Sequence, residues 1–216
     1  MGTIEGFLSF IDRADSLGVS EEWSINWRSV RRDGRALHLE VFIETRSEDI
    51  PDQSWVFRVD DLREIDLKEG GFAAHGEVVF SRDHVLLWGY KDLVSQLNFA
   101  GPPANREGLI WDLYQRHHQV TGGWIPFNRY LGIHNRLSDG HGVLAQGPDQ
   151  LLQEYASVLK GSGLEPYFPY PPHPPVRVYG PNGVSELLWK AEEEELSVLV
   201  LFDSYIVGTG FSAEPV

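Results

Sequence analysis

Residues 111–142 combine histidines, aromatic residues and arginines more densely than any other stretch of this chain. Four of the eight histidines lie there: His117, His118, His134 and His141. Imidazole and carboxylate groups can bind a metal ion or transfer protons, whereas exposed aromatic and arginine side chains can anchor a protein partner. We therefore expect a functional site in this segment.

Three of its residues are candidates for catalysis or metal binding. His134 and His141 lie seven residues apart with Asp139 between them, so two imidazoles and a carboxylate could converge. Their spacing matches no recognised ligand pattern, and no H-E-x-x-H pair is present. We predict no metal ion and no cofactor, and we keep the trio as candidate acid–base groups or ligands of a hydrolase.

A second group of residues is suited to binding without catalysis. Exposed tryptophan, tyrosine and arginine side chains are enriched at the energetic centres of protein interfaces. The binding surface that we predict comprises His118, Trp124, Asn128, Arg129 and Tyr130.

The segment that follows Gly123 also has a purely structural interpretation. Trp124, Phe127 and Leu131 would then fold inward and close a helix onto a sheet, with Asn128, Arg129 and His134 left at the rim. For the histidine pair that precedes it, the structural interpretation places His117 on the packed face of the helix and His118 in solvent.

Other catalytic motifs are missing from the sequence. There is no cysteine, which excludes disulfides, thiolate catalysis and cysteine-ligated metals. The sequence also has no G-x-S-x-G nucleophile motif, no Walker A loop and no G-x-G-x-x-G fingerprint. His38, Glu40 and Glu44 alternate along one strand, as the polar face of a half-buried sheet requires. These absences make an enzyme the less favoured class.

The chain is acidic, with 32 Asp and Glu against 18 Lys and Arg and a formal net charge of −14. This charge repels nucleic-acid phosphates and anionic membranes, so we expect neither as a partner. It favours fast association with a basic protein. No signal-like segment or membrane-length apolar run is present, and we expect a cytoplasmic, bacterial-type protein.

Hydrophobic periodicity changes twice along the chain. Residues 4–11 have helical spacing, and residues 23–90 alternate as an antiparallel sheet with a hairpin turn at Gly34. Asn105 is placed to cap a helix that ends at Gly122 and packs through one face, formed by Leu109, Ile110, Leu113, Tyr114 and His117. Pro148 opens another helix that ends at Gly161. The expected strands are 23–27, 37–43, 55–59, 62–67, 77–80, 85–88, 143–146, 176–179, 184–190, 196–202 and 204–207, with an irregular segment at 124–142 and a fraying tail after Gly210.

This pattern predicts an α+β fold with mostly antiparallel sheet and about three helices. We expect a β-rich region at residues 1–100 and an α+β region at residues 101–216, either separate or packed as one domain. The function that we expect is non-catalytic binding of a basic protein, in the manner of an immunity protein or antitoxin. The alternative is a hydrolase, metal-dependent or not, that uses the His/Asp cluster of residues 112–141. The sequence does not specify an oligomeric state.

Overall fold

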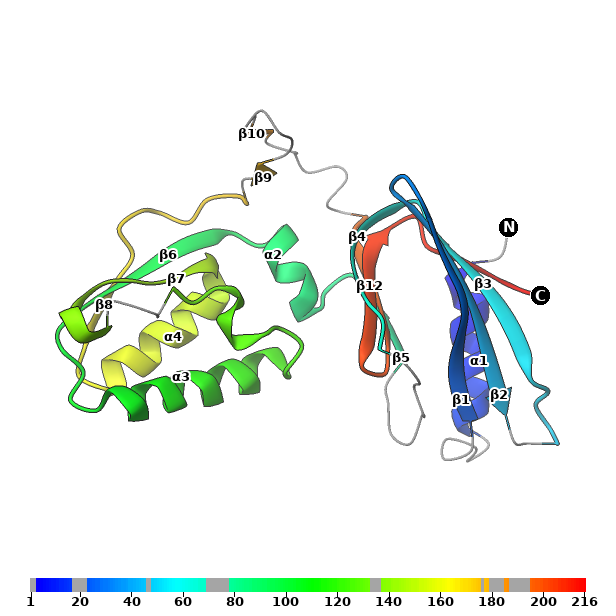
Figure 1. The fold of residues 1–216 in the computed structure, drawn as a ribbon, viewed down its shortest axis with the longest axis horizontal. Helices are drawn as coiled ribbons and strands as arrows, with labels where there is room; N and C mark the ends of the chain where they lie inside the picture. The colour runs from blue at the N-terminus through cyan, green and yellow to red at the C-terminus, as the bar shows by residue number, and fades with distance from the viewer. Residues whose placement is uncertain are drawn as a thin grey trace. The chain divides into compact units, whose positions relative to one another are not determined.

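The computed structural model describes residues 3–16, 23–45, 48–68, 78–132, 137–175, 177–178, 185–186 and 195–216. This part of the chain confirms the predicted α+β class, with four α-helices and antiparallel strand pairing throughout. The chain forms two compact units. We call residues 1–84 with 191–216 the split unit, because it combines both ends of the chain, and residues 85–190 the inserted unit (Figure 1).

The first sheet of the split unit has the strand order β1-β2-β3-β13. Its strands are β1 (Trp23–Asp33), β2 (Ala36–Thr45), β3 (Gln53–Val59) and β13 (Ser212–Pro215). Buried residues alternate along β2, as its sequence predicts. Gly34, at φ +59°, supplies the left-handed residue of the β1–β2 turn.

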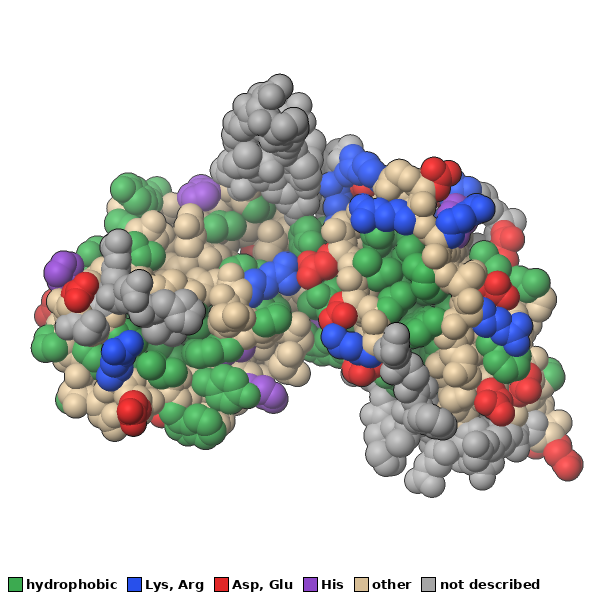
Figure 2. Space-filling view, in the orientation of Figure 1, with side chains coloured by type: hydrophobic (Ala, Val, Ile, Leu, Met, Phe, Trp, Pro, Cys, Tyr) green, Lys and Arg blue, Asp and Glu red, His purple; other side chains and the backbone are tan. Residues whose placement is uncertain are grey.

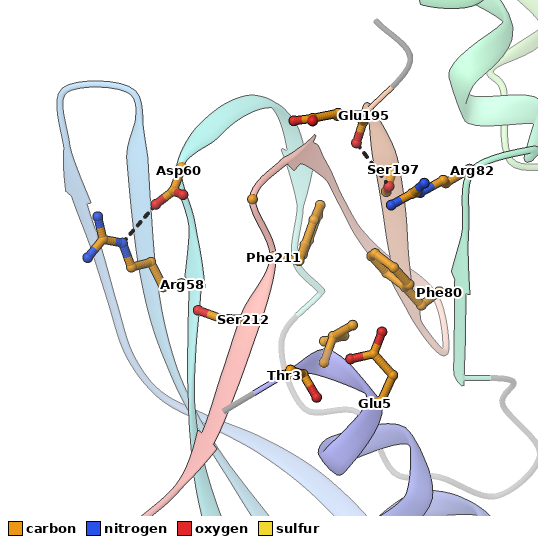
Figure 3. Close-up of a pocket in the computed structure, with 12 residues that line it drawn as sticks. Thr3, Glu5, Arg58, Asp60, Phe80, Arg82, Glu195, Ser197, Phe211 and Ser212 are labelled. Carbon is orange, nitrogen blue, oxygen red and sulfur yellow. Dashed lines mark hydrogen bonds and ion pairs between the residues drawn. The ribbon is translucent and has the colours of Figure 1, made fainter. Parts of the chain in front are cut away.

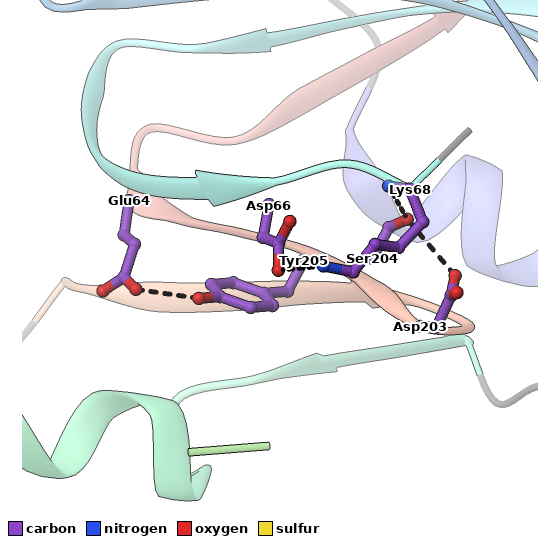
Figure 4. Close-up of polar contacts among 6 residues, drawn as sticks. All are labelled: Glu64, Asp66, Lys68, Asp203, Ser204 and Tyr205. Atoms are coloured by element: carbon purple, nitrogen blue, oxygen red, sulfur yellow. Dashed lines mark hydrogen bonds and ion pairs between the residues drawn. The ribbon is translucent and has the colours of Figure 1, made fainter. Parts of the chain in front are cut away.

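The second sheet is joined to the first by short connections along the chain. It comprises β4 (Asp61–Asp66), β12 (Ser204–Thr209), β11 (Ser197–Leu201) and β5 (Val78–Ser81), in that order. Only Asp60 separates β3 from β4. Polar contacts tie β4 to β12: the Tyr205 hydroxyl donates to Glu64 Oε1 at 2.8 Å, and the Lys68 backbone N–H donates to Ser204 Oγ at 3.0 Å (Figure 4).

Helix α1 (Ile4–Ser16) supplies a large share of the split-unit core. Phe7 is fully buried, and its ring meets Phe57 edge-on at 4.7 Å and Trp55 at 5.4 Å. Leu199 and Ile206 from the second sheet join the same apolar cluster. The helix and both sheets therefore enclose one core.

The inserted unit is a three-stranded sheet with two helices on one face (Figure 1). Its sheet has the order β7 (His141–Pro148), β6 (Val94–Ala100), β8 (Glu165–Tyr167). The helices are α3 (Arg106–Thr121) and α4 (Asp149–Gly161); a short α2 (Trp88–Lys91) precedes the sheet, and β9 (Arg177–Val178) pairs with β10 (Ser185–Glu186) beyond it. As predicted, Asn105 caps α3: its Oδ1 accepts from Gly108 N–H at 3.0 Å.

Two local predictions were wrong, and one strand was not predicted. The expected strand 85–88 is a 3₁₀ turn followed by α2, and the expected fraying tail pairs with β3 as β13. Strand β6, at the centre of its sheet, was not predicted. A run such as Val85–Trp88 has no period that separates strand from helix, and β13 owes its conformation to a distant partner.

Among the described residues, no helix combines the length and the apolar character needed to cross a bilayer.

Candidate binding surface

The predicted catalytic trio is only partly described, because His134 lies outside the described residues. His141 Nδ1 donates to the backbone carbonyl of Asp139 at 3.0 Å, and both side chains are exposed. The contact therefore uses the main chain of Asp139 and leaves its carboxylate out. Among the described residues, no group of three or more histidine or acidic side chains is arranged to hold a metal ion.

His117 is part of the core of the inserted unit. Its side chain is 2% exposed, its Nε2 donates to the Ile125 carbonyl at 2.6 Å, and its Nδ1 accepts from the Tyr155 hydroxyl at 2.6 Å. Burial lowers the pKa of His117 and raises the pKa of Tyr155. The neutral imidazole joins α3 to α4 and to the segment after α3, whereas His118 is exposed.

The segment after α3 lies partly inward, through the predicted Leu131 and through Ile125, which was not predicted. Ile125 and Leu131 are buried, and Trp124 and Phe127 are half-buried. Tyr130 packs on β7, where a Cβ added to Gly147 would come within 2.6 Å of the tyrosine ring.

An exposed row of aromatic side chains runs along the outer side of α3. Trp111 is 59% exposed and Tyr114 is 39% exposed, and their rings stack with centroids 5.7 Å apart and 27° between the planes. Phe127 meets Tyr114 edge-on at 5.5 Å. We call Trp111, Tyr114 and Phe127 the α3 aromatic stripe. Figure 2 shows hydrophobic side chains along the edge of the inserted unit where Figure 1 places α3.

Three of the five predicted binding residues lie beside this stripe. The His118 ring is 6.3 Å from that of Tyr114, and Asn128 and Arg129 are exposed on the same 3₁₀ turn as Phe127. Trp124 and Tyr130 are half-buried. Trp111 was not predicted as a binding residue, although its spacing of three residues from Tyr114 places the two rings on one helix face.

The net charge is divided unequally between the two units. Residues 1–84 and 191–216 contain 24 acidic and 10 basic residues, whereas residues 85–190 contain eight of each. The split unit therefore carries the whole formal charge of −14 and the inserted unit is neutral. The excess of negative charge and the α3 aromatic stripe thus belong to different units.

Charge is also separated within the first sheet of the split unit. Four arginines lie around the β1–β2 turn, and four exposed acidic residues lie at the far end of β2 and in the connection to β3. At about 3.3 Å per residue, the ten residues of β2 separate the two groups by about 30 Å. Figure 2 shows the basic group near the turn. We call Glu44, Glu48, Asp49 and Asp52 the acidic end.

No family model matches this sequence, and searches of curated proteins and of solved structures found no similar protein.

Proposed function

We propose that this chain is a non-catalytic binding module for a basic protein, in the manner of an immunity protein or antitoxin. The observation that carries the proposal is the confinement of the entire −14 charge to one compact unit. A single-sign field of this kind raises the rate of encounter with an oppositely charged partner.

The acidic end is the part of the split unit best placed for such a contact. Its four side chains are exposed and lie within nine residues of sequence. Asp52 also holds the local backbone, because its Oδ1 accepts from the Thr45 N–H at 2.7 Å. This hydrogen bond restrains Asp52, so less conformational entropy is lost at that residue when a partner binds.

The α3 aromatic stripe supplies a separate anchor on the inserted unit. Large exposed aromatic side chains in contact with one another are uncommon on a monomer surface and are typical of interface centres. The stripe replaces Trp124 and Tyr130 as the centre of the predicted contact, and it keeps His118, Asn128 and Arg129 beside it.

The test begins with capture of partners on the tagged chain, followed by kinetics with the purified partner. Replacing Glu44 and Glu48 with Gln is expected to lower the association rate and its dependence on salt, because steering is electrostatic. The matched control replaces Asp139 with Asn and Glu165 with Gln, which changes the net charge equally in the other unit. A captured partner that is acidic would contradict the proposal.

The anchor is tested through the dissociation rate. Trp111→Ala is expected to speed dissociation about tenfold or more, as loss of an interface centre does. Tyr170→Ala is the control, because Tyr170 is 66% exposed in the same unit but outside the stripe. Equal dissociation rates for the two variants would remove the stripe from the interface.

A further inference from the structure

A cavity of about 500 Å³ lies wholly within the split unit. It is bounded by the start of α1, the ends of β3 and β5, the start of β11 and the connection between β12 and β13 (Figure 3). Its volume is in the range of sites that hold small molecules or single large side chains.

Two phenylalanines form the apolar wall of this cavity. Phe80 and Phe211 meet edge-on with centroids 5.3 Å apart, and both are half-buried. Figure 3 shows Phe211 with Glu195 on one side and Glu5 on the other. A cation that lies beside both an aromatic face and a carboxylate is attracted by the quadrupole of the ring and by the negative charge of the carboxylate.

The charged groups of the cavity are two arginines and three acids. Arg58 Nε donates to Asp60 Oδ1 at 2.8 Å, so these two charges offset each other. The pKa of Glu5 is lowered by its own backbone N–H, then by the Thr3 hydroxyl, with a further contribution from Arg82. Arg82 therefore already acts on Glu5.

Glu195 is the third acidic residue of the cavity. It is exposed at the mouth of the cavity, and Ser197 Oγ donates to its backbone carbonyl at 3.2 Å, which leaves the carboxylate uninvolved in that bond. Among the described residues, no cation forms an ion pair with the Glu195 carboxylate. Three acids against two arginines in its lining give the cavity a net negative formal charge beside an apolar wall.

We propose that this cavity binds an alkylguanidinium or alkylammonium group. The charged head lies at Glu195, and the apolar stem packs on Phe80 and Phe211. The same chemistry is found in a free small molecule and in an arginine or lysine side chain of a protein. No residue that lines the cavity belongs to the acidic end or to the α3 aromatic stripe, so a test with small ligands does not depend on the proposed function.

The test is a titration followed by amide NMR signals, with Nα-acetyl-arginine amide as the probe. Its uncharged near-isostere, Nα-acetyl-citrulline amide, is the matched control ligand. We expect saturable shifts at Phe80, Arg82 and Phe211 with the arginine compound and at least fivefold weaker binding of the citrulline compound. Equal binding of both ligands, or no saturable shift at these residues, would overturn the proposal.

Variants locate the ligand within the cavity. Glu195→Gln and Phe211→Ala are each expected to weaken binding two- to fivefold, the usual effect of one exposed ion pair or cation–π contact. Asp12→Asn removes an exposed carboxylate of the same unit that does not line the cavity, and this variant is expected to bind like the wild type. If Glu195→Gln also binds like the wild type, the proposal is wrong.

Two further ligands test whether the site binds a cation or an anion, and whether the cation belongs to a free small molecule or to a protein side chain. Acetate that shifts the same amides at lower concentration than the arginine compound would identify an anion site at Arg82 and overturn the proposal. Free arginine that binds more tightly than its capped form supports a small-molecule ligand. Equal binding of the two supports a side chain as the natural occupant.

Discussion

The Nδ1 atom of His117 accepts a hydrogen bond from the Tyr155 hydroxyl at 2.6 Å, and both side chains are buried between α3 and α4. The other ring nitrogen donates to the Ile125 carbonyl. Both nitrogens are therefore satisfied only when the imidazole is neutral and carries its proton on Nε2. The arrangement fixes a tautomer and makes the inserted unit sensitive to changes at either side chain.

Removing the Tyr155 hydroxyl is expected to destabilise the inserted unit. Tyr155→Phe leaves the His117 Nδ1 acceptor buried without a donor, which costs about 1–3 kcal/mol. Urea unfolding followed through amide signals of the inserted unit measures this change. Tyr170→Phe is the control, since Tyr170 is exposed. Equal midpoints for the two variants would show that the hydrogen bond contributes nothing.

The stability of the inserted unit is expected to fall as the pH decreases from about 7 to 5. Burial lowers the pKa of folded His117 below its ordinary value of 6.5. The unfolded chain therefore binds a proton first, and protonation favours unfolding until the pH reaches the lowered value. The free energy of unfolding at a series of pH values measures the effect.

A pair of histidine variants tests the origin of this pH dependence. His117→Gln is expected to reduce stability at pH 7 and to flatten the profile between pH 5 and 7. His118→Gln, which changes the exposed neighbour, is expected to retain the slope. A profile that His118→Gln flattens and His117→Gln does not would contradict the assignment.

Gly147 is expected to tolerate no side chain. A Cβ there would come within 2.6–3.1 Å of three atoms of Tyr130, so either the ring or the strand must move. Gly147→Ala is expected to cost about 1–3 kcal/mol, the usual penalty of overpacking. Gly161→Ala is the control, since nothing lies within 4 Å of the added atom. Thermal unfolding of both variants decides the point.

Asp52 is expected to stabilise the connection between β2 and β3. Asp52→Ala removes the acceptor for the Thr45 N–H and is expected to cost about 1 kcal/mol. Glu48→Ala removes a neighbouring exposed acid and is expected to leave stability within about 0.5 kcal/mol. A similar loss in both variants would indicate a general charge effect instead.

Local signals in the sequence predicted the elements that local chemistry determines. The cap at Asn105, the turn at Gly34 and the alternation of β2 are all confirmed. Strand β6 was missed because its inward positions begin with Ser95, a polar residue that is 2% exposed and interrupts the apolar alternation. Ser95 is satisfied by the Asp149 carboxylate, 54 residues away, which no local pattern reveals.

The candidate binding surface could also be predicted only in part, because local patterns in the sequence do not show tertiary packing. The helical row of Leu109, Leu113 and His117 was expected to be buried, and it is. Tyr114 was assigned to the same packed face, but α4 covers the leucine row and leaves Tyr114 partly exposed beside Trp111. How far a neighbouring helix covers a face depends on tertiary packing, so the sequence did not show which aromatic residues of α3 are exposed.

The split unit has a consequence for the order in which this protein folds on the ribosome. Strand β5 ends at Ser81, and its partner β11 begins at Ser197, so synthesis of the inserted unit separates them. At about 5–20 residues per second, the first strands wait roughly 6–23 s for their partners. The inserted unit can fold during this interval, whereas the N-terminal strands keep apolar edges exposed. We therefore expect chaperones to bind the nascent N-terminal segment and proteases to cleave it during this interval.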